Sequence, residues 1–591
     1  MKPSRIWFAA LLGILTLAFA LRLYALDGQS MWSDEGLSLY RAQQPLAALF
    51  ANQIVVDGIA TTDTNPPFYF LLLHGWRALV GDSVFLLRFP GAVLAALAVP
   101  LLYAIGRLLG GRRLGFAAAL LLALSPFHIW QAQVMRNYGL LVTLNLATIY
   151  ALFRYICGSR HWSWLLLWLL LSLIAIYTHF FGFFVFAFGL LALGVALLVG
   201  EGRRLLRQRW FWLALTLGLL LTLPVIPLAL GRFRAGQQID FYRVPVLDIL
   251  HHAVSAYGVG VSPTVTHPWW RWLPAALLVL AGLVVAWRRS RTAFWLLLGY
   301  QVVPLALLVL LSLVNPLYNG VRHLLIGLPP FLLLAGWGIV GRRGLARRAG
   351  FSLGLLFLAV QVGWLWTQFN APELVRDDVR GAATYLNEVA RPDDVVVLHD
   401  TLISFTFDHY YQGAAPVVSV PAYGQQDEQA ALQRLQQVAA GADRVWFLVQ
   451  PAPRTGFDRS LLRDWARSNW LEIDARSFPW MWLPVSLEAY VADPYLREMP
   501  SGATVHQAFW PGVLRLHGYE LPPDLASGNS WWPTFFLEQE GADNRQYSLS
   551  VRLETGGKTW SFAEHVLGGA LRPPGSWPAN TLVRVVAPMS L

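Results

Sequence analysis

An adjacent pair of acids, Asp34 and Glu35, stands in a short polar stretch that follows the first long apolar run of the chain. One carboxylate of such a pair can accept a proton from an attacking hydroxyl while its neighbour holds a substrate or a cation. The same residues are also typical of a helix start, because acidic side chains and hydroxyls cap the first turn. Spacing alone leaves two interpretations open, a general base and a helix cap.

Arginine and histidine side chains supply the opposite chemistry. Arg136 lies in the stretch Gln133-Val134-Met135-Arg136-Asn137-Tyr138, and an arginine there could hold a phosphate by two parallel hydrogen bonds, with Tyr138 and His128 as further donors. The alternative is an ion pair between Arg136 and one of the acids. The same two interpretations apply to His179 and to the pair Arg322-His323.

The elements that carry these residues are those of a membrane protein. The chain has 591 residues, of which 56% are hydrophobic and 13% charged, and its mean hydropathy is +0.47. These values exclude an ordinary soluble or disordered protein. Apolar stretches long enough to span a bilayer predict a mainly α fold with about eleven transmembrane helices. They cover residues 6–26, 83–109, 113–130, 138–157, 162–178, 180–200, 209–230, 271–287, 292–314, 321–341 and 349–368.

Charge orients these helices. Residues 1–369 carry 28 Lys+Arg and 9 Asp+Glu, a net +19, whereas residues 370–591 carry 17 and 25, a net −8. Basic clusters fall in every second connection, as in cytoplasmic loops, and not along one face as in a nucleic-acid binder. We therefore expect a plasma-membrane protein with a cytoplasmic N-terminus, residues 370–591 outside, and no nucleic-acid partner. A cleaved signal peptide over the first twenty residues is the alternative to a retained first helix.

The acids of the membrane half lie almost entirely on the outer side of this topology. Of the nine, Glu201 alone falls in a cytoplasmic connection, and such one-sided placement is a functional-site hypothesis. A membrane transferase is one class that fits. A glycolipid transporter or a scaffold for the outer domains is the rival, although the spans carry almost none of the charges that a transport path needs.

Five motifs in order along roughly the first 370 residues carry a family resemblance. They are Trp32-x-Asp34-Glu35, Asp63-x-Asn65-Pro66-Pro67-x-Tyr69, Gln133-x-x-Arg136-x-Tyr138, Tyr177-Thr178-His179-Phe180 and Arg322-His323 with Pro329-Pro330. With these motifs the chain resembles the bacterial, protein-mannosyltransferase-like branch of glycosyltransferase family 39, which belongs to the GT-C membrane enzymes.

The resemblance implies transfer of a sugar from a polyprenyl-phosphate donor to an acceptor hydroxyl on the outer membrane face. By motif position, Asp34 would be the base on the acceptor and Glu35 its neighbour in the catalytic site. Donor phosphate or sugar would be bound by Asp63, Asn65, Arg136, Tyr138, His179, Arg322 and His323. A single displacement at the anomeric carbon inverts the configuration and needs no second nucleophilic carboxylate.

Two positions depart from the family pattern. Asn65 stands where many relatives have His, and Asn137 follows Arg136 where relatives vary. Either departure could alter metal use, so a divalent metal is compatible with the site but is not required by it. The sequence does not identify the sugar, nor whether the acceptor is a protein, a lipid or a glycan.

Beyond the last apolar run the composition becomes that of a soluble protein. Alternating helical and strand-like stretches predict an extracytoplasmic α/β layer over residues 370–500, after a transmembrane domain at 1–369. Alternating apolar and polar residues predict a β-sandwich-like domain at 501–591. Its tryptophans could stack on sugar rings, or they could pack in the core. These are Trp531, Trp532, Trp560 and Trp577.

Overall fold

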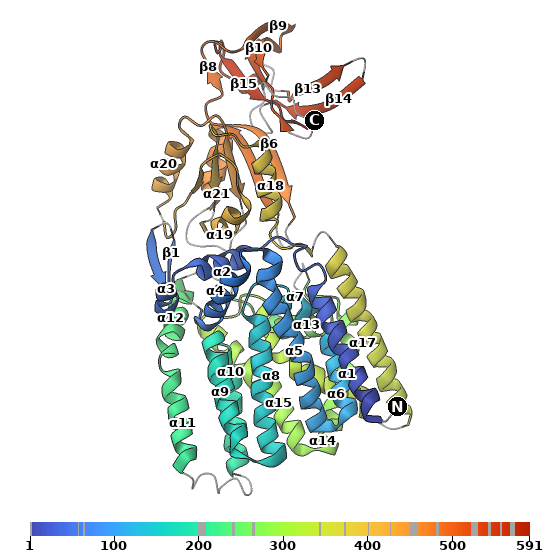
Figure 1. The fold of residues 1–591 in the computed structure, drawn as a ribbon. Helices are drawn as coiled ribbons and strands as arrows, with labels where there is room; N and C mark the ends of the chain where they lie inside the picture. Colours follow the sequence, from blue (N-terminus) through green and yellow to red (C-terminus); the bar gives the residue numbers. More distant parts are fainter. Residues whose placement is uncertain are drawn as a thin grey trace. The chain divides into compact units, whose positions relative to one another are not determined.

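The fold is seen in a computed structural model, whose ribbon is drawn in Figure 1. It describes residues 3–56, 58–62, 65–198, 209–238, 243–262, 266–341, 344–371, 374–399, 401–425, 427–449, 459–479, 481, 484–521, 530–541, 545–555, 558–567 and 574–590. Two compact units are present. Unit 1 comprises Met1–Gln29, Ser38–Val55 and Ala60–Val375, and unit 2 comprises Ser30–Leu37, Val56–Ile59 and Arg376–Leu591.

Unit 1 is a helical bundle. Within the described residues, seven helices are long and apolar enough to cross a membrane, or nine if each of two bent helix pairs is one span. The seven are α1 (Pro3–Leu23), α5 (Val84–Gly110), α8 (Tyr138–Arg154) with the π-helical η1 (Tyr155–Ser159), α14 (Trp269–Arg289), α15 (Arg291–Val314), the 3-10 helix η3 (Val321–Gly327) with α16 (Leu328–Val340), and α17 (Leu345–Asn370).

The bent pairs are α6 (Arg112–Ala123) with α7 (Pro126–Ala132), at 59°, and α11 (Arg209–Thr222) with α12 (Val225–Gln238), at 42°. Two further expected spans, α9 (Trp162–Thr178) and α10 (Gly182–Leu198), are apolar helices of 17 residues each. The multi-helix membrane fold is therefore confirmed. The number of eleven spans stays a prediction.

The expected continuous span at 113–130 is wrong in one respect, because the helix breaks after Leu124. Ser125 caps α7, its hydroxyl accepting from the His128 N–H, and Pro126 occupies the first turn of α7, where its missing N–H costs nothing. Arg22 of α1 binds two carbonyls at the end of α6, donating to Leu122 O at 3.0 Å and Ala123 O at 3.2 Å. A buried arginine thus satisfies the broken helix end.

Small residues allow α14 and α16 to pack closely. A Cβ atom on Gly338 of α16 would overlap the carbonyl of Leu278 in α14, and one on Gly282 of α14 would overlap the carbonyl of Leu334 in α16. Close backbone approach through small residues is how helices associate in a bilayer, where lipid tails are as apolar as leucine.

Short elements connect the helices of the bundle at its remaining turns. They are α2 (Ser33–Gln43), α3 (Leu46–Ala51), the hairpin of β1 (Gln53–Val56) and β2 (Ile59–Thr62), α4 (Phe68–Val80) and α13 (Val246–Gly258). Helix α4 starts directly after Pro67, and its Leu72 and Leu79 are exposed.

The first part of unit 2 is an α/β layer, as predicted. Its sheet has the order β4-β3-β5-β7-β6, with β3 parallel to both neighbours and β7 antiparallel to β5 and β6. The strands are β3 (Val395–Leu398), β4 (Val417–Ser419), β5 (Val445–Val449), β6 (Leu471–Phe478) and β7 (Val485–Val491). The helices are α18 (Val379–Val389), α19 (Thr401–Tyr410), α20 (Glu428–Ala439) and α21 (Arg459–Asn469). Strands β3 and β5 are buried at every residue, which explains their unbroken apolar runs.

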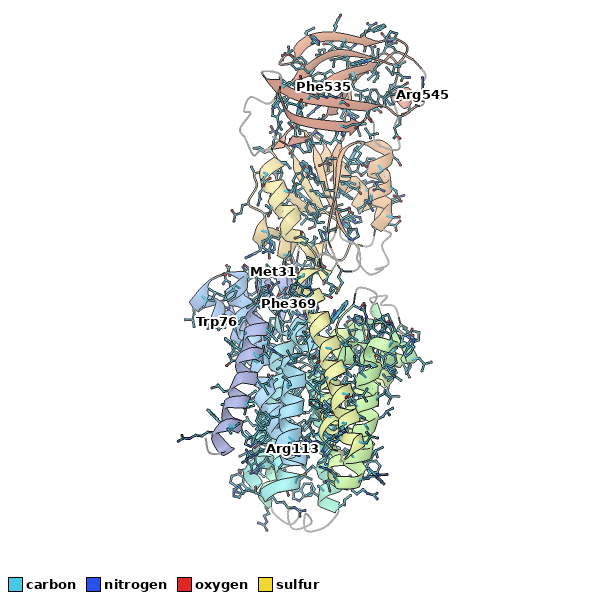
Figure 2. All side chains as sticks on the ribbon, turned by 90° about the vertical axis from the view of Figure 1, so that its right-hand side faces the viewer. Met31, Trp76, Arg113, Phe369, Phe535 and Arg545 are labelled. Carbon is cyan, nitrogen blue, oxygen red and sulfur yellow. The ribbon has the colours of Figure 1, made fainter. Side chains whose placement is uncertain are left out.

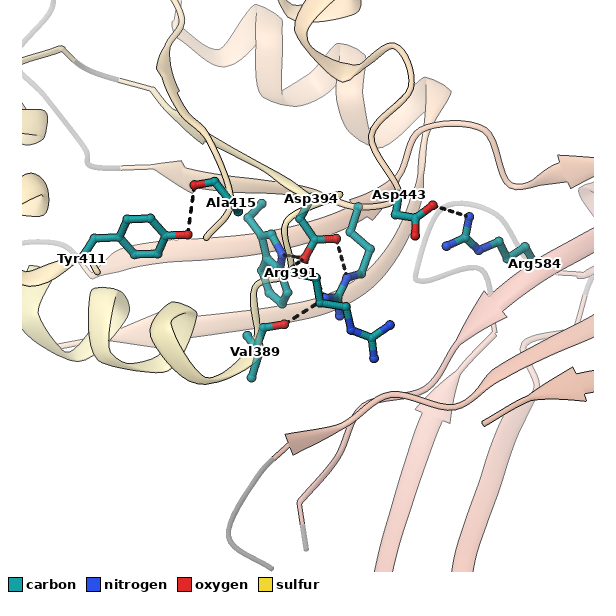
Figure 3. A network of polar contacts seen from close by, with 9 residues as sticks. Val389, Arg391, Asp394, Tyr411, Ala415, Asp443 and Arg584 are labelled. Carbon is teal, nitrogen blue, oxygen red and sulfur yellow. Dashed lines mark hydrogen bonds and ion pairs between the residues drawn. The ribbon is translucent and has the colours of Figure 1, made fainter. Parts of the chain in front are cut away.

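A buried ion pair joins two turns of this layer (Figure 3). Arg444 donates to both carboxylate oxygens of Asp394, at 2.9 and 2.6 Å, and Trp446 Nε1 donates to the same carboxylate at 3.1 Å. The neighbouring Asp443 pairs with Arg584 of β15 at 3.4 Å. These contacts tie the α/β layer to the strands that follow it.

The C-terminal part of unit 2 is rich in β structure. Its five-stranded sheet has the order β8-β15-β12-β10-β9, and β11-β16 and β13-β14 form two-stranded pairs. The strands are β8 (Tyr495–Leu496), β9 (Thr504–Trp510), β10 (Leu514–Glu520), β11 (Ser530–Trp531), β12 (Thr534–Gln539), β13 (Ser548–Thr555), β14 (Lys558–Val566), β15 (Leu582–Val586) and β16 (Met589–Ser590). A sandwich stays a prediction, as do the three domain boundaries.

Of the four tryptophans considered for sugar stacking, three are core residues. Trp531, Trp532 and Trp577 are 6%, 2% and 4% exposed. Trp532 packs edge-on against Trp446 at 5.4 Å between ring centroids. Sugar stacking on these three rings is therefore wrong, because their faces are covered, and the side chain of Trp560 lies outside the described residues.

Candidate active site

Helix α2 carries the acidic pair in its first turn. The carbonyl of Trp32 accepts from the N–H groups of Glu35 and Gly36 at 2.8 and 3.1 Å, so the helix begins at Ser33. Asp34 is half-buried and lies in the first turn of the helix.

Glu35 plays a different part from Asp34. It is fully buried, and its carboxylate Oε2 accepts from the backbone N–H of Trp32 at 3.4 Å. In a capping box, an acid at the third residue of a helix accepts in this way from the backbone N–H of the residue before the helix. Glu35 therefore caps the helix, whereas Asp34 is the less buried acid of the pair. A catalytic part for either residue stays a prediction.

Arg136 is held in unit 1 by the later part of the same helix. Its guanidinium Nη1 donates to the hydroxyl of Ser38 at 3.0 Å, and both residues are buried. Ser38 follows Asp34 by four residues, about one helical turn. The next residue, Asn137, donates from Nδ2 to the carbonyl of Thr178 at 3.0 Å, which fixes the start of α8 beside the end of α9.

A row of rings continues from this point within unit 1. The ring of Tyr138 lies 6.1 Å from that of His179, His179 lies 4.6 Å from Phe181, and Phe181 meets His323 edge-on at 4.9 Å. We call Tyr138, His179, Phe181 and His323 the ring cluster. Three of the residues singled out in the sequence therefore come together from α8, the end of α9 and η3.

Hydrogen bonds fix the imidazole tautomers of the ring cluster. His179 Nδ1 accepts from the N–H of Phe181 at 3.1 Å, and His323 Nδ1 accepts from the N–H of Asn319 at 3.4 Å. A neutral imidazole that accepts at Nδ1 carries its hydrogen on Nε2. Each histidine thus keeps an N–H donor on the nitrogen away from its backbone contact.

Further polar residues extend the cluster along η3 and α13. Arg322, next to His323, donates to Asn319 Oδ1 at 3.1 Å. Tyr318 lies 6.2 Å from the His323 ring, and its hydroxyl is 2.8 Å from His252 Nδ1. Tyr318 and His252 widen the polar region that the motifs indicated.

His128 does not serve as a donor beside Arg136, as the sequence suggested. It is 1% exposed, and its Nδ1 lies 2.7 Å from Arg22 Nη2. Arginine can only donate, so His128 accepts this bond. His128 lies in α7 just after the break from α6. Arg22 lies at the same break, because it also donates to the Leu122 and Ala123 carbonyls at the end of α6.

Two motif residues and a metal remain to be placed. Asp63 lies outside the described residues, and Asn65 lies at a bend three residues before α4, which starts at Phe68. Across the residues that the structure does describe, no three His, Cys, Asp or Glu side chains gather as a metal site.

Sequence reasoning missed several partners in these groups. Phe181 follows the Tyr177-Thr178-His179-Phe180 motif directly, so a longer reading of that motif would have included it. Ser38 gives no signal, because a serine four residues after an acid is common in helices. The contact that identifies it, with Arg136, joins residues 98 positions apart.

Comparisons with known proteins agree with this architecture. Residues 64–227 match the sequence model of the dolichyl-phosphate-mannose-protein mannosyltransferase family. No curated protein sequence matches the chain. The fold is similar to that of ArnT from Cupriavidus metallidurans bound to undecaprenyl phosphate, with 14% identity and a TM-score of 0.51 over 82% of this chain and 98% of that one.

A second solved structure shares the fold. The Archaeoglobus fulgidus oligosaccharyltransferase, tethered with an acceptor peptide, has a TM-score of 0.50 and 12% identity over 75% of this chain and 69% of that one. This chain has the fold of the GT-C membrane glycosyltransferases, and residues 64–227 match one of their family models. The GT-C assignment confirms the resemblance seen in the motifs, and at these identities the structural likeness speaks for the fold.

Proposed function

We propose that this GT-C protein transfers a sugar from a polyprenyl-phosphate donor to an acceptor hydroxyl on the outer face of the plasma membrane, with inversion at the anomeric carbon. One observation carries the proposal. Helix α2 has a half-buried acid, Asp34, in its first turn, and one turn later Ser38 accepts a hydrogen bond from the buried Arg136. A base for the acceptor and a cation for the leaving phosphate thus belong to one short helix and its partner.

Asp34 is the proposed general base. As the acceptor oxygen attacks the anomeric carbon, its proton passes to the Asp34 carboxylate, and the bond from the anomeric carbon to the phosphate oxygen breaks with its electron pair leaving on the polyprenyl phosphate. The buried Glu35 accepts a hydrogen bond from the Trp32 N–H and so fixes the helical turn that carries Asp34.

The donor is proposed to bind through arginine and the ring cluster. The planar guanidinium of Arg136 suits a phosphate, and the Nε2–H groups of His179 and His323 can donate to phosphate or sugar oxygens. The ArnT structure contains undecaprenyl phosphate, and a ligand of that class supports a lipid-phosphate donor here. Asp63, Asn65, Tyr138 and Arg322 are proposed as further donor contacts because they stand at the matching motif positions.

The orientation is also a proposal. Figure 2 shows Arg113 at one end of the bundle of unit 1 and Trp76 and Phe369 at the opposite end. Arg113 belongs to a basic cluster of the kind that marks cytoplasmic loops. We propose that the Arg113 end of the bundle is cytoplasmic. The segment that carries Asp34 and Glu35 and residues 376–591 would then be outside. The acceptor is a protein, a lipid or a glycan reached from that side.

A transfer assay with a single substitution tests the proposal. Purified protein is incubated with a panel of radiolabelled polyprenyl-phosphate sugars and membrane extract, comparing wild type, Asp34→Asn and, as a control, Asp248→Asn on the exposed face of α13. Wild type and the control should transfer label, and Asp34→Asn should not. If neither wild type nor Asp34→Asn transfers from any donor while both fold alike, the transporter or scaffold function takes its place.

A further inference from the structure

We propose that the α/β layer of unit 2 positions the catalytic carboxylate, because it binds the segment Ser30–Leu37, which carries Asp34. We call Ser30–Leu37 the acid segment. The inference rests on the proposed function of Asp34. It adds Asp377 and Tyr410 as positioning residues, together with Gly36 and Thr406, which are in contact. None of these residues lies in a motif of the membrane half.

Asp377 binds the start of helix α2. Its carboxylate Oδ2 accepts from the Ser33 hydroxyl at 3.2 Å and from the Ser33 N–H at 3.4 Å. Asp377 is 2% exposed, so this carboxylate is committed to the protein interior. Since Ser33 immediately precedes Asp34, the two bonds fix the backbone that carries the proposed base.

The residues before the helix are bound as well. The N–H of Met31 donates to the hydroxyl of Tyr410 at 3.0 Å, and the hydroxyl of Ser30 accepts from the N–H of Arg380 at 3.1 Å. Met31 is fully buried and Ser30 is 1% exposed. Two helices of the layer, α18 and α19, therefore supply partners to a segment more than 340 residues earlier.

Gly36 brings the helix into contact with α19. A Cβ atom at this position would overlap the Thr406 hydroxyl and would lie 2.6 Å from the Thr406 backbone nitrogen and 2.8 Å from the Phe405 carbonyl carbon. The Thr406 hydroxyl also donates to the Trp32 carbonyl at 3.3 Å. Two of the atoms that a side chain at 36 would meet are backbone, so no rotamer change relieves the overlap. Only glycine permits this approach.

The consequence is that the geometry of Asp34 depends on the α/β layer. A general base must lie within hydrogen-bond reach of the proton that it accepts, and misplacement by about 1 Å can cost about a hundredfold in rate. Release of the acid segment should therefore lower kcat and leave the KM for the donor nearly unchanged, since the donor-binding residues proposed above lie in unit 1.

Gly36→Ala in the full-length protein tests the inference, with Gly75→Ala of α4 as its matched control. A Cβ atom at Gly75 meets nothing within 4 Å. Hydrogen–deuterium exchange of peptides that cover the acid segment reports its attachment without any substrate. We expect faster exchange in Gly36→Ala alone, with peptides of β3 and β5 still protected, and about a hundredfold lower kcat for sugar transfer.

A second pair of variants separates positioning from folding. Asp377→Asn keeps an oxygen that can accept from Ser33, and Asp377→Ala does not. Exchange and kcat should be near wild type in the asparagine variant and altered in the alanine variant. Rescue by asparagine would support the inference, because a general loss of fold would affect both.

The outcomes are distinguishable. Unchanged exchange in Gly36→Ala would overturn the attachment, and faster exchange with an unchanged kcat would overturn the positioning. A raised donor KM at normal kcat would assign the contacts to substrate binding and so overturn it too. A wild type that transfers no sugar from any donor would overturn the proposed function itself, and the positioning of a catalytic base would fall with it.

Discussion

Arg136 donates a hydrogen bond from Nη1 to the hydroxyl of Ser38 across 3.0 Å, with both side chains buried. The bond joins the segment between α7 and α8 to helix α2. A buried guanidinium is costly unless it is hydrogen-bonded, and it is also the group best suited to a phosphate. The Arg136–Ser38 bond therefore places the cation of the proposed donor site at the helix that begins with the proposed base.

Replacement of Arg136 by lysine should weaken use of the donor. Lysine keeps the charge but loses the planar fork, and a hydrogen bond to a charged group contributes about 1.5–3 kcal/mol, or roughly 10–150-fold in kcat/KM. Arg154→Lys at the far end of α8 is the control, since Arg154 lies against Trp164 at 5.0 Å. The measurement is kcat/KM for the donor, obtained from initial rates at a series of donor concentrations. Equal values for the two variants would remove Arg136 from the donor site.

The imidazole Nε2–H of His179 should matter to transfer in a way that its ring shape does not. His179→Phe keeps the ring contacts with Tyr138 and Phe181 but removes the donor, whereas His179→Gln keeps a donor at similar reach. We expect the phenylalanine variant to lose about tenfold or more in kcat/KM and the glutamine variant to retain most of it. If His179→Phe had a higher kcat/KM than His179→Gln, the role of His179 would be packing and not hydrogen-bond donation.

Close packing of α14 against α16 predicts a position-specific effect of a single methyl group. Gly338→Ala places a Cβ on the Leu278 carbonyl, and overpacking of this kind costs about 1–3 kcal/mol or more. Gly363→Ala on α17, whose Cβ meets nothing within 4 Å, is the matched control. Thermal unfolding in detergent should show a lower Tm for Gly338→Ala alone. Two unchanged Tm values would contradict the packing described for these helices.

Local patterns predicted the elements well. Bilayer-length apolar runs located the long helices, and alternating helical and strand-like stretches located the α/β layer. Unbroken apolar runs marked β3 and β5, because a strand buried on both faces must be apolar throughout. These signals work because each depends on neighbours along the chain.

The candidate site was only partly predictable, because its decisive contacts join distant residues. Ser33 and Asp377 are 344 positions apart, and Asp377 gave no signal beyond that of a helix start. Arg22 reaches Leu122 and His128 across 100 and 106 positions, which turned His128 from an expected donor into an acceptor. Residue type limits what each group can do, and only the fold determines its partner.

Glu488 of β7 gives unit 2 a defined acid sensitivity. Burial alone would raise the pKa of Glu488, but hydrogen bonds from Arg463 and Tyr490 and the charges of Arg463 and Arg467 outweigh it and leave the pKa below its usual range. Arg463 Nε and Arg467 Nη2 each donate to Oε1 at 2.8 Å, and Tyr490 donates to Oε2 at 2.6 Å. The ionised carboxylate is therefore the stabilising form.

The sign of the pH effect follows from this depressed pKa. A carboxyl group whose pKa is lower in the folded state stabilises the fold fully above its unfolded pKa, about 4.3 for glutamate, and loses that contribution as the pH falls through the folded value. Glu488→Gln should thus lower the Tm of unit 2 at pH 7, and the difference from wild type should shrink below about pH 4. Glu498→Gln, at an exposed position, is the control. It should change neither the Tm at pH 7 nor the dependence of the Tm on pH. A Glu488→Gln variant whose Tm deficit stayed constant from pH 7 to pH 3 would show that the loss is one of packing and not of charge.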